Sequence, residues 1–109
     1  MKKVIGKTAT NVTEKYIARD TGNDSREWCV KYHNMNVAVV EKFYDGTVSV
    51  ALNTGGFDTA TTKRRMNETS EQFDLGFKVF AKDFDWFVIT RDDKLVPFVD
   101  GMVAFNQLW

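Results

Sequence analysis

Two adjacent glycines, Gly55 and Gly56, separate a run of alternating apolar residues from the one convincing helical pattern in the chain. Glycine adopts positive φ at little steric cost, so the pair lets the backbone turn sharply at this point. Asp58 or Thr59 follows, and either side-chain oxygen is suited to cap the first turn of a helix. The sequence therefore predicts a strand that runs into the glycines, a turn, and then a helix.

The pattern after the turn is amphipathic. Residues on one face recur at helical spacing, which is typical of a helix that packs on a sheet. These residues are Thr62, Met66, Thr69 and Phe73. The residues expected to face solvent are Lys63, Arg64, Asn67, Glu68 and Glu71. We expect the helix to bury Met66 and Phe73 and to end near residues 74–76.

The residues before the glycines read as strands. Residues 27–33 and 47–52 alternate between apolar and polar side chains, which indicates half-buried strands. Residues 37–40 are apolar on both faces and predict a central strand. Together the three segments predict an antiparallel meander. Further upstream, residues 1–12 fit an edge strand, and residues 13–19 fit either a strand or a helical turn.

The residues after the helix also read as short strands. Two to four are expected over residues 77–99 and 102–105, with residues 82–85 as a hairpin loop. Pro97 cannot donate to a sheet ladder, so its strand belongs at an edge or an irregularity. The order predicts a single α+β domain over residues 1–109, with a mostly antiparallel sheet and the helix packed on one face.

Composition narrows the class of protein. The chain has 109 residues, of which 43% are hydrophobic and 14% aromatic, as expected of one folded domain. Its 15 basic residues balance 15 acidic ones, so a strongly basic nucleic-acid binder is not indicated, although a local basic patch remains open. Cys29 is the only cysteine, and no window reaches the ~20 apolar residues of a membrane span. With no signal-peptide pattern either, we expect a soluble intracellular protein.

Residues 52–67 resemble a recurrent signature of small, uncharacterised proteins encoded by tailed bacteriophages. In that signature a strand ends in Asn-x-Gly-Gly-aromatic, and a Thr-x-Thr-Thr-Lys-x-Arg-aliphatic-Asn helix follows. Residues 79–88 are similar to the second block of these proteins, an aromatic-x-Lys-x-x-x-Trp run, and residues 97–101 fit the end of the pattern. Phe57 and Met66 stand where other residues are common. The resemblance implies a phage origin and a small accessory role, and it implies no mechanism.

The start of the helix is the first candidate site. Free backbone N–H groups and the helix dipole attract anions, and hydroxyls and cations cluster here. The candidate ligand-binding residues are Gly55, Gly56, Thr59, Thr61, Thr62, Lys63, Arg64 and Arg65. The glycine spacing is not that of a P-loop. The alternative is structural: threonines cap helices, and Arg64 can pair with Glu68 four residues on.

Other chemistries are weakly indicated. Cys29 and His33 share a face of one strand but stand ~13 Å apart at the usual rise per residue, too far for a catalytic pair. One cysteine and one histidine do not make a zinc site without carboxylates. The aspartates that remain, Asp83, Asp85, Asp92 and Asp93, fall in predicted turns. We therefore expect no metal, no cofactor and no enzymatic activity.

Aromatic residues are the second candidate. Phe77, Phe80, Phe84, Trp86, Phe87 and Phe98 cluster in the second half of the chain. Three roles are open for these rings. They fill the core, they stack on bases, or they anchor a protein partner or a second copy of the chain. The rings singled out as partner contacts are Trp28, Trp86 and Trp109.

We expect a non-enzymatic phage protein in the host cytoplasm that binds a nucleic acid or nucleotide at the helix start. The alternative is a protein-interaction module that inhibits a host enzyme or defence factor through an exposed aromatic patch.

Overall fold

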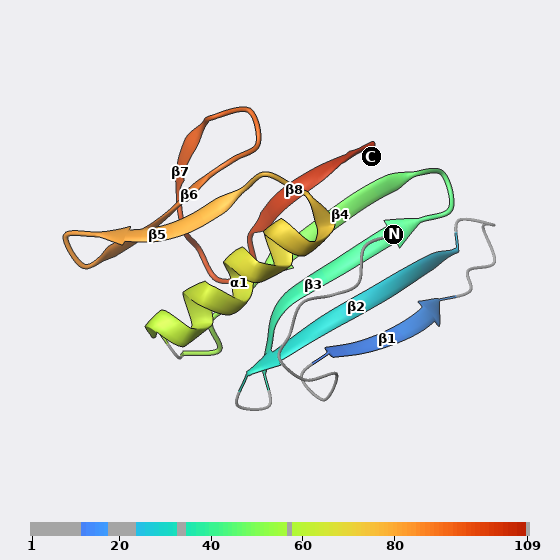
Figure 1. Ribbon diagram of the computed structural model, residues 1–109, viewed down its shortest axis with the longest axis horizontal. Coiled ribbons are helices and arrows are strands. Elements are labelled where there is room, and N and C mark those ends of the chain that lie inside the picture. Colours follow the sequence, from blue (N-terminus) through green and yellow to red (C-terminus); the bar gives the residue numbers. More distant parts are fainter. Residues whose placement is uncertain (1–11, 18–23, 33–34, 57, 109) are drawn as a thin grey trace.

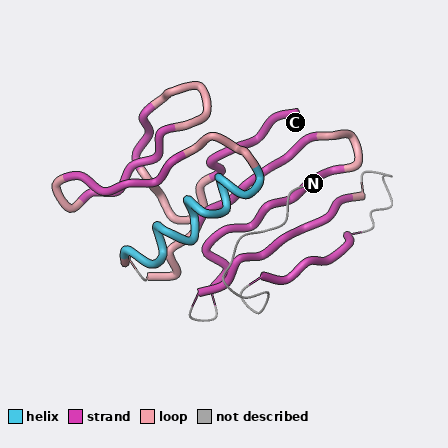
Figure 2. Tube along the Cα trace, viewed as in Figure 1, coloured by secondary structure: helices cyan, strands magenta, loops and turns pink. Residues whose placement is uncertain are grey.

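The computed structural model of the chain describes residues 12–17, 24–32, 35–56 and 58–108. Most of the expected N-terminal edge strand, together with His33 and Trp109, lies outside these ranges. The described residues form two antiparallel sheets and one helix (Figures 1 and 2), which confirms the α+β class. The sequence pattern had indicated one sheet; the later strands instead divide between two.

The larger sheet contains the predicted meander at its centre. Its order is β1-β2-β3-β4-β8, and every neighbouring pair is antiparallel. The strands are β1 (Val12–Ile17), β2 (Ser25–Tyr32), β3 (Met35–Phe43), β4 (Thr47–Leu52) and β8 (Val103–Leu108). The segment that fitted either a strand or a helical turn is therefore a strand, β1. The last strand of the chain, β8, returns to pair with β4, so sequence-distant residues complete this sheet.

Helix α1 (Ala60–Phe73) begins and ends as the sequence predicts. Thr59 is the N-cap, and its Oγ1 accepts a hydrogen bond from Thr62 N at 3.2 Å. Asp74 closes the helix in the left-handed region, with φ of 57°. The predicted packing face is confirmed, because all four of its residues are buried. Phe73 packs on the larger sheet with its ring 5.5 Å from that of Trp28.

The smaller sheet follows the helix. Its strands are β5 (Lys78–Lys82), β6 (Asp85–Ile89) and β7 (Leu95–Pro97), in the order β5-β6-β7. Pro97 lies in the edge strand, as expected of a residue that cannot donate to the ladder. In Figure 1 the β5–β6 hairpin projects away from the larger sheet, beyond the helix.

One hydrophobic core joins the two sheets and the helix. On the larger sheet, Trp28, Val40, Val50 and Phe105 occupy one row across four strands, and all are buried. On the smaller sheet, the corresponding inner row is Val79, Val88 and Val96. The opposite face of the smaller sheet therefore lies outside this core.

Candidate functional site

The loop before the helix uses its own backbone donors. Gly55 N donates to Asn53 Oδ1 at 2.7 Å, and Gly56 N donates to Thr54 Oγ1 at 3.1 Å. Thr54 is in turn held by Asp100, whose carboxylate accepts from Thr54 N at 2.8 Å and from Thr54 Oγ1 at 3.0 Å. The N–H groups of both glycines therefore donate within the loop. Asp100, in the turn before β8, holds this loop through its hydrogen bonds to Thr54.

The two glycines have different local roles. Gly55 has φ of +63°, and a Cβ built on it would overlap the side chain of Met35. Gly56 has φ of +87°, but a Cβ there would meet nothing within 4 Å. Gly55 therefore packs closely on Met35, and the positive φ of Gly56 follows from the turn.

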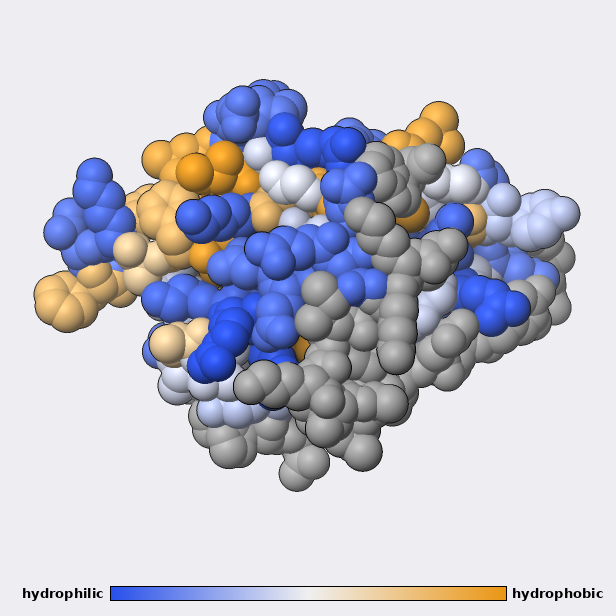
Figure 3. All heavy atoms as spheres, in the orientation of Figure 1, coloured by the Kyte–Doolittle hydropathy of each residue, from blue (hydrophilic) through white to orange (hydrophobic). Residues whose placement is uncertain are grey.

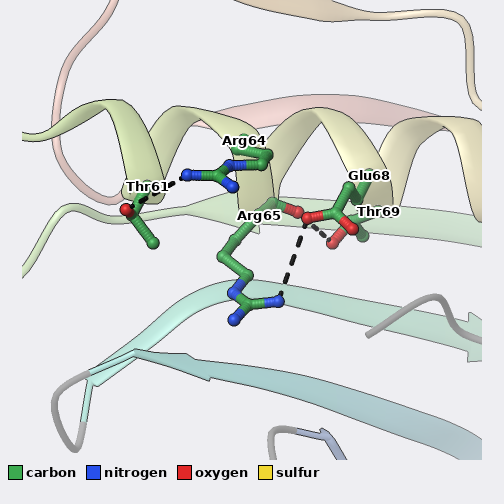
Figure 4. A network of polar contacts seen from close by, with 5 residues as sticks. All are labelled: Thr61, Arg64, Arg65, Glu68 and Thr69. Carbon is green, nitrogen blue, oxygen red and sulfur yellow. Dashed lines mark hydrogen bonds and ion pairs between the residues drawn. The ribbon is translucent and has the colours of Figure 1, made fainter. Parts of the chain in front are cut away.

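The three basic residues of the helix start contact this chain. Lys63 Nζ lies 5.2 Å from the centre of the Trp86 ring. Arg64 Nη2 donates to Thr61 Oγ1 at 3.4 Å (Figure 4). The guanidinium of Arg65 points toward the strands and lies 3.9 Å from Glu68, so the expected pairing of Arg64 with Glu68 is replaced by Arg65 with Glu68. Each cation is at least partly engaged within the chain.

The groove beside the helix has mixed charge. It has a volume of about 510 Å³ and lies between α1 and β5. The residues that line it include Lys63 and Arg64 at the helix start and Glu68 and Glu71 farther along. An anionic ligand in this groove would meet both signs of charge, so the groove does not select phosphate by charge alone.

The three tryptophans predicted as partner contacts differ in how they are buried. Trp28 is 7% exposed and belongs to the core, so its ring does not offer a contact surface; this corrects the expectation from the sequence. Trp86 is half-buried, with its ring 5.4 Å from Phe98 in an edge-on arrangement and Lys63 on it. Trp109 is outside the described residues. Three further rings, the half-buried Phe80 and Phe87 and the exposed Phe84, belong to the smaller sheet and its hairpin.

Apolar residues gather on the outer face of the smaller sheet. Phe80 and Phe87 are cross-strand neighbours with stacked rings 5.8 Å apart, and Pro97 pairs with Phe87 on the other side. Ile89 pairs with Lys78 on one side and with Leu95 on the other, and both of these neighbours are exposed, so the face is apolar with a basic edge. Figure 3 shows hydrophobic residues gathered over this sheet, whereas the exposed surface of the helix is hydrophilic. We call the residues Phe80, Phe87, Ile89, Leu95 and Pro97 the outer face.

The tip of the β5–β6 hairpin carries a further aromatic ring. The hairpin loop is two residues long, Asp83 and Phe84, and not the four expected. Both have positive φ, 52° and 70°, as in a type I′ turn, where asparagine and glycine are preferred. The side chain of Phe84 is fully exposed, at 103% of its reference area. A bulky ring therefore occupies an unfavourable backbone conformation without packing against the described chain.

The described residues offer little for metal or nucleophilic chemistry. No group of three or more histidine, cysteine, aspartate or glutamate side chains among them is placed to hold a metal ion. Cys29 is buried, and its thiol donates to Glu27 Oε1 at 3.2 Å. Asp92 accepts a hydrogen bond from the Thr90 hydroxyl, which lowers the pKa of its carboxyl group. In the described part of the chain, α1 is too short and too polar to cross a bilayer.

The fold and site describe a small α+β protein with an apolar outer sheet face and a fully exposed ring, Phe84, at the adjoining hairpin tip. A family model for the Kyanoviridae Gp96 protein matches residues 3–105. The chain belongs to this family of phage proteins, which confirms the phage origin expected from the sequence. No curated protein and no solved structure matches it.

Proposed function

We propose that this phage protein acts in the infected cell by binding another protein through the outer face and the adjoining hairpin tip. The observation that carries the proposal is Phe84, a fully exposed aromatic ring held at φ of 70°. A non-glycine residue in the left-handed region costs about 1–2 kcal/mol, and an exposed ring gains no burial in return. Such strain is found where function requires the side chain.

The arrangement suits a protein partner. Aromatic anchors that enter an apolar pocket supply much of the binding energy at protein interfaces. Phe84 projects from a narrow hairpin, and the stacked pair Phe80 and Phe87 lies on an adjoining strand surface. A projecting anchor beside a flatter apolar surface allows a partner to bury both in one interface.

Charges near the tip disfavour a nucleic-acid partner. Asp83 and Asp85 flank Phe84, and Lys82 pairs with Asp85; all three charged residues are exposed, so the tip carries two negative charges against one positive. A base stacked on the ring would bring its phosphates close to these two carboxylates, which would repel them. A protein pocket with a basic rim would instead be attracted.

The nucleotide hypothesis has less support. It depends on the cations at the helix start, yet Lys63 contacts Trp86 and Arg65 contacts Glu68. It also depends on glycine N–H groups that donate within their own loop. The interaction module, the second of the two functions considered from the sequence, is therefore the function that the contacts favour.

The test is capture of partners from nuclease-treated lysate of phage-infected host cells, with three immobilised proteins compared. The wild type is compared with Leu95→Lys, which places a charge on the exposed part of the outer face, and with a variant carrying Lys63→Ala, Arg64→Ala and Arg65→Ala. We expect a partner retained by the wild type and the triple variant but lost by Leu95→Lys. Retention by Leu95→Lys with loss in the triple variant, or a partner that the wild type captures from untreated but not from nuclease-treated lysate, would support the nucleic-acid hypothesis instead.

A further inference from the structure

Side chains of helix α1 close part of the edge of the smaller sheet that strand β5 presents to them (Figure 1). Just before the strand, Ser70 Oγ donates to Phe77 O at 2.7 Å, and within it Asn67 bonds both backbone groups of Val79. As residue numbers fall along the helix, they rise along the strand. The next position on this edge is therefore Ala81, which lies level with the start of the helix.

The backbone N–H and C=O of Ala81 point away from β6. Residues of an antiparallel ladder alternate, so that one directs both backbone groups toward its partner strand and the next directs both away. Val79 directs both groups to Asn67, and Ala81, two residues on, has the same orientation. Its cross-strand neighbour Trp86 has the matching orientation, because the Trp86 carbonyl accepts from Phe98 N at 2.9 Å on the far side of β6. Among the described residues, none bonds to either backbone group of Ala81.

The groove between α1 and β5 contains this open position. Its volume of about 510 Å³ lies within the range of ligand-binding clefts. Lys63 and Arg64 line the groove at the level of Ala81, and Glu68 and Glu71 line it farther along the helix. The open donor and acceptor of the strand thus lie at the basic end of a groove whose other end is acidic.

Arg64 and Glu71 are the charged residues of this groove that are best placed to meet a ligand, since both are exposed. A guanidinium carries five N–H donors, and the hydrogen bond of Arg64 to Thr61 Oγ1 is long, at 3.4 Å. Glu71 forms no ion pair with the described residues. The other two charged residues of the groove contact side chains of this chain. Arg64 and Glu71 stand ~10 Å apart along the helix axis, which is the length of about three residues of extended peptide.

We propose that this groove binds an extended peptide segment of a partner protein, antiparallel to β5, through one residue that exchanges two hydrogen bonds with Ala81. A peptide residue supplies both the donor and the acceptor that this position lacks, just as the amide of Asn67 does for Val79. The segment carries an acidic side chain that meets Arg64 and, about three residues later, a basic side chain that meets Glu71.

The edge of β5 limits how such a segment is recognised. The helix occupies the edge before Ala81, and the hairpin turn begins at Asp83. A long added strand is therefore blocked, and recognition rests on one backbone pair and two charges. This inference is independent of the proposed function, since of the outer-face residues only Phe80 also lines the groove.

The test is an NMR titration of the isotope-labelled full chain with the synthetic peptide acetyl-Asp-Ala-Ala-Lys-amide. We expect the amide signal of Ala81 to shift as this peptide binds. Two control peptides keep the same side chains: in one the order is reversed to Lys-Ala-Ala-Asp, and in the other both alanines are N-methylated. Each should bind about tenfold more weakly, because the first brings like charges together and the second lacks the N–H donor.

Proline at the open position removes the donor of the strand itself. The β5–β6 ladder does not use the N–H of Ala81, and proline is tolerated at such an edge position. Ala81→Pro should therefore lower the affinity for the peptide about tenfold, whereas Ala81→Ser, which keeps the N–H, should bind as the wild type does. Arg64→Ala should also weaken binding, and it should not weaken binding further when the aspartate of the peptide is replaced by asparagine. Leu95→Lys, on the outer face, should leave the affinity unchanged.

An Ala81 signal that does not shift up to millimolar peptide would overturn the proposal. Equal affinity for the N-methylated or the charge-reversed peptide would do the same, as would unchanged binding by Ala81→Pro. Should Ala81→Pro fail to fold, the N-methylated peptide answers the same question on the wild type. Binding that disappears in Leu95→Lys would place the peptide on the outer face and would also overturn the proposal.

Discussion

Asn67 on helix α1 exchanges two hydrogen bonds with the backbone of Val79 in β5. Its Nδ2 donates to Val79 O at 2.9 Å, and its Oδ1 accepts from Val79 N at 2.8 Å. The amide side chain thereby takes the place of a neighbouring strand at the edge of the smaller sheet. This contact attaches the sheet that carries the proposed binding surface to the helix.

Removal of this amide should destabilise the protein. Asn67→Ala leaves both backbone groups of Val79 without their partner, at a cost of about 1–3 kcal/mol in the free energy of unfolding. Urea denaturation measures the loss. Glu71→Ala, an exposed substitution on the same helix, is the control and should change stability by less than about 0.5 kcal/mol. Equal effects of the two substitutions would contradict the structural role of Asn67.

The glycine pair gives a second, internally matched test. Gly55→Ala adds a Cβ that overlaps Met35 and also strains a φ of +63°, whereas Gly56→Ala adds only strain at +87°. We expect Gly56→Ala to cost about 1 kcal/mol and Gly55→Ala at least about 2 kcal/mol more, as in overpacked cores. Thermal unfolding of both variants shows which of them loses more stability. A larger loss for Gly56→Ala would mean that packing on Met35 is not what constrains the loop.

The sequence predicted local features better than distant ones. The bounds of α1 followed from Thr59 and from the spacing of Met66 and Phe73, which are signals carried within a few residues. The pairing of β8 with β4 joins segments half the chain apart, and strand spacing alone does not indicate it. The hairpin loop was predicted at the right place, residues 82–85, but two residues too long, because Asp83–Phe84 lacks the glycine that usually marks a two-residue loop.

The candidate site was predicted only in part. Aromatic clustering indicated the second half of the chain, where the outer face lies, but alternation along β6 did not reveal which rings face outward. Trp28 is buried because its row meets Phe73 of the helix, a contact that exists only after folding. The basic residues at the helix start were visible as charges, whereas their contacts with Trp86 and Glu68 required the fold.

Arg65 supplies a third prediction. Its side chain is 20% exposed, its Nε is buried and has no hydrogen-bond partner among the described residues, and its contact with Glu68 is long, at 3.9 Å. Replacing both partners removes the long ion pair without leaving either charge alone, so the double variant Arg65→Met/Glu68→Gln should raise the free energy of unfolding by about 1 kcal/mol. Glu68→Gln alone should instead lower it, since the guanidinium loses its nearby carboxylate. Chemical denaturation of both variants tests the pair, and a strong loss in the double variant would show that the ion pair is structurally required.

Asp45 makes stability depend on pH at the acidic end. The backbone N–H of Thr47 donates to its carboxylate at 2.9 Å, and this bond lowers the pKa of Asp45 below its ordinary value of 3.8. A lowered folded-state pKa favours the ionised form, so its stabilisation is present above the ordinary pKa and disappears as pH falls through the folded-state value. Asp45→Asn keeps an acceptor oxygen but no charge. The stability difference between wild type and variant should shrink on acidification, and carboxyl NMR titration should show the lowered pKa directly.

Phe84, in the proposed function, is kept exposed for a partner at a cost to stability. Phe84→Gly removes the ring and places at φ of 70° a residue that tolerates it, so the variant should be more stable by about 1 kcal/mol. Tyr44→Gly, at the β3–β4 turn, removes another exposed ring and is the matched control.

The most direct measurement therefore combines urea denaturation with quantitative capture of partners from nuclease-treated lysate of infected cells, for wild type, Phe84→Gly and Tyr44→Gly. We predict that Phe84→Gly unfolds at higher urea and loses a protein that wild type and Tyr44→Gly both retain. A Phe84→Gly variant that captures the same proteins as wild type, whatever its stability, would contradict the account.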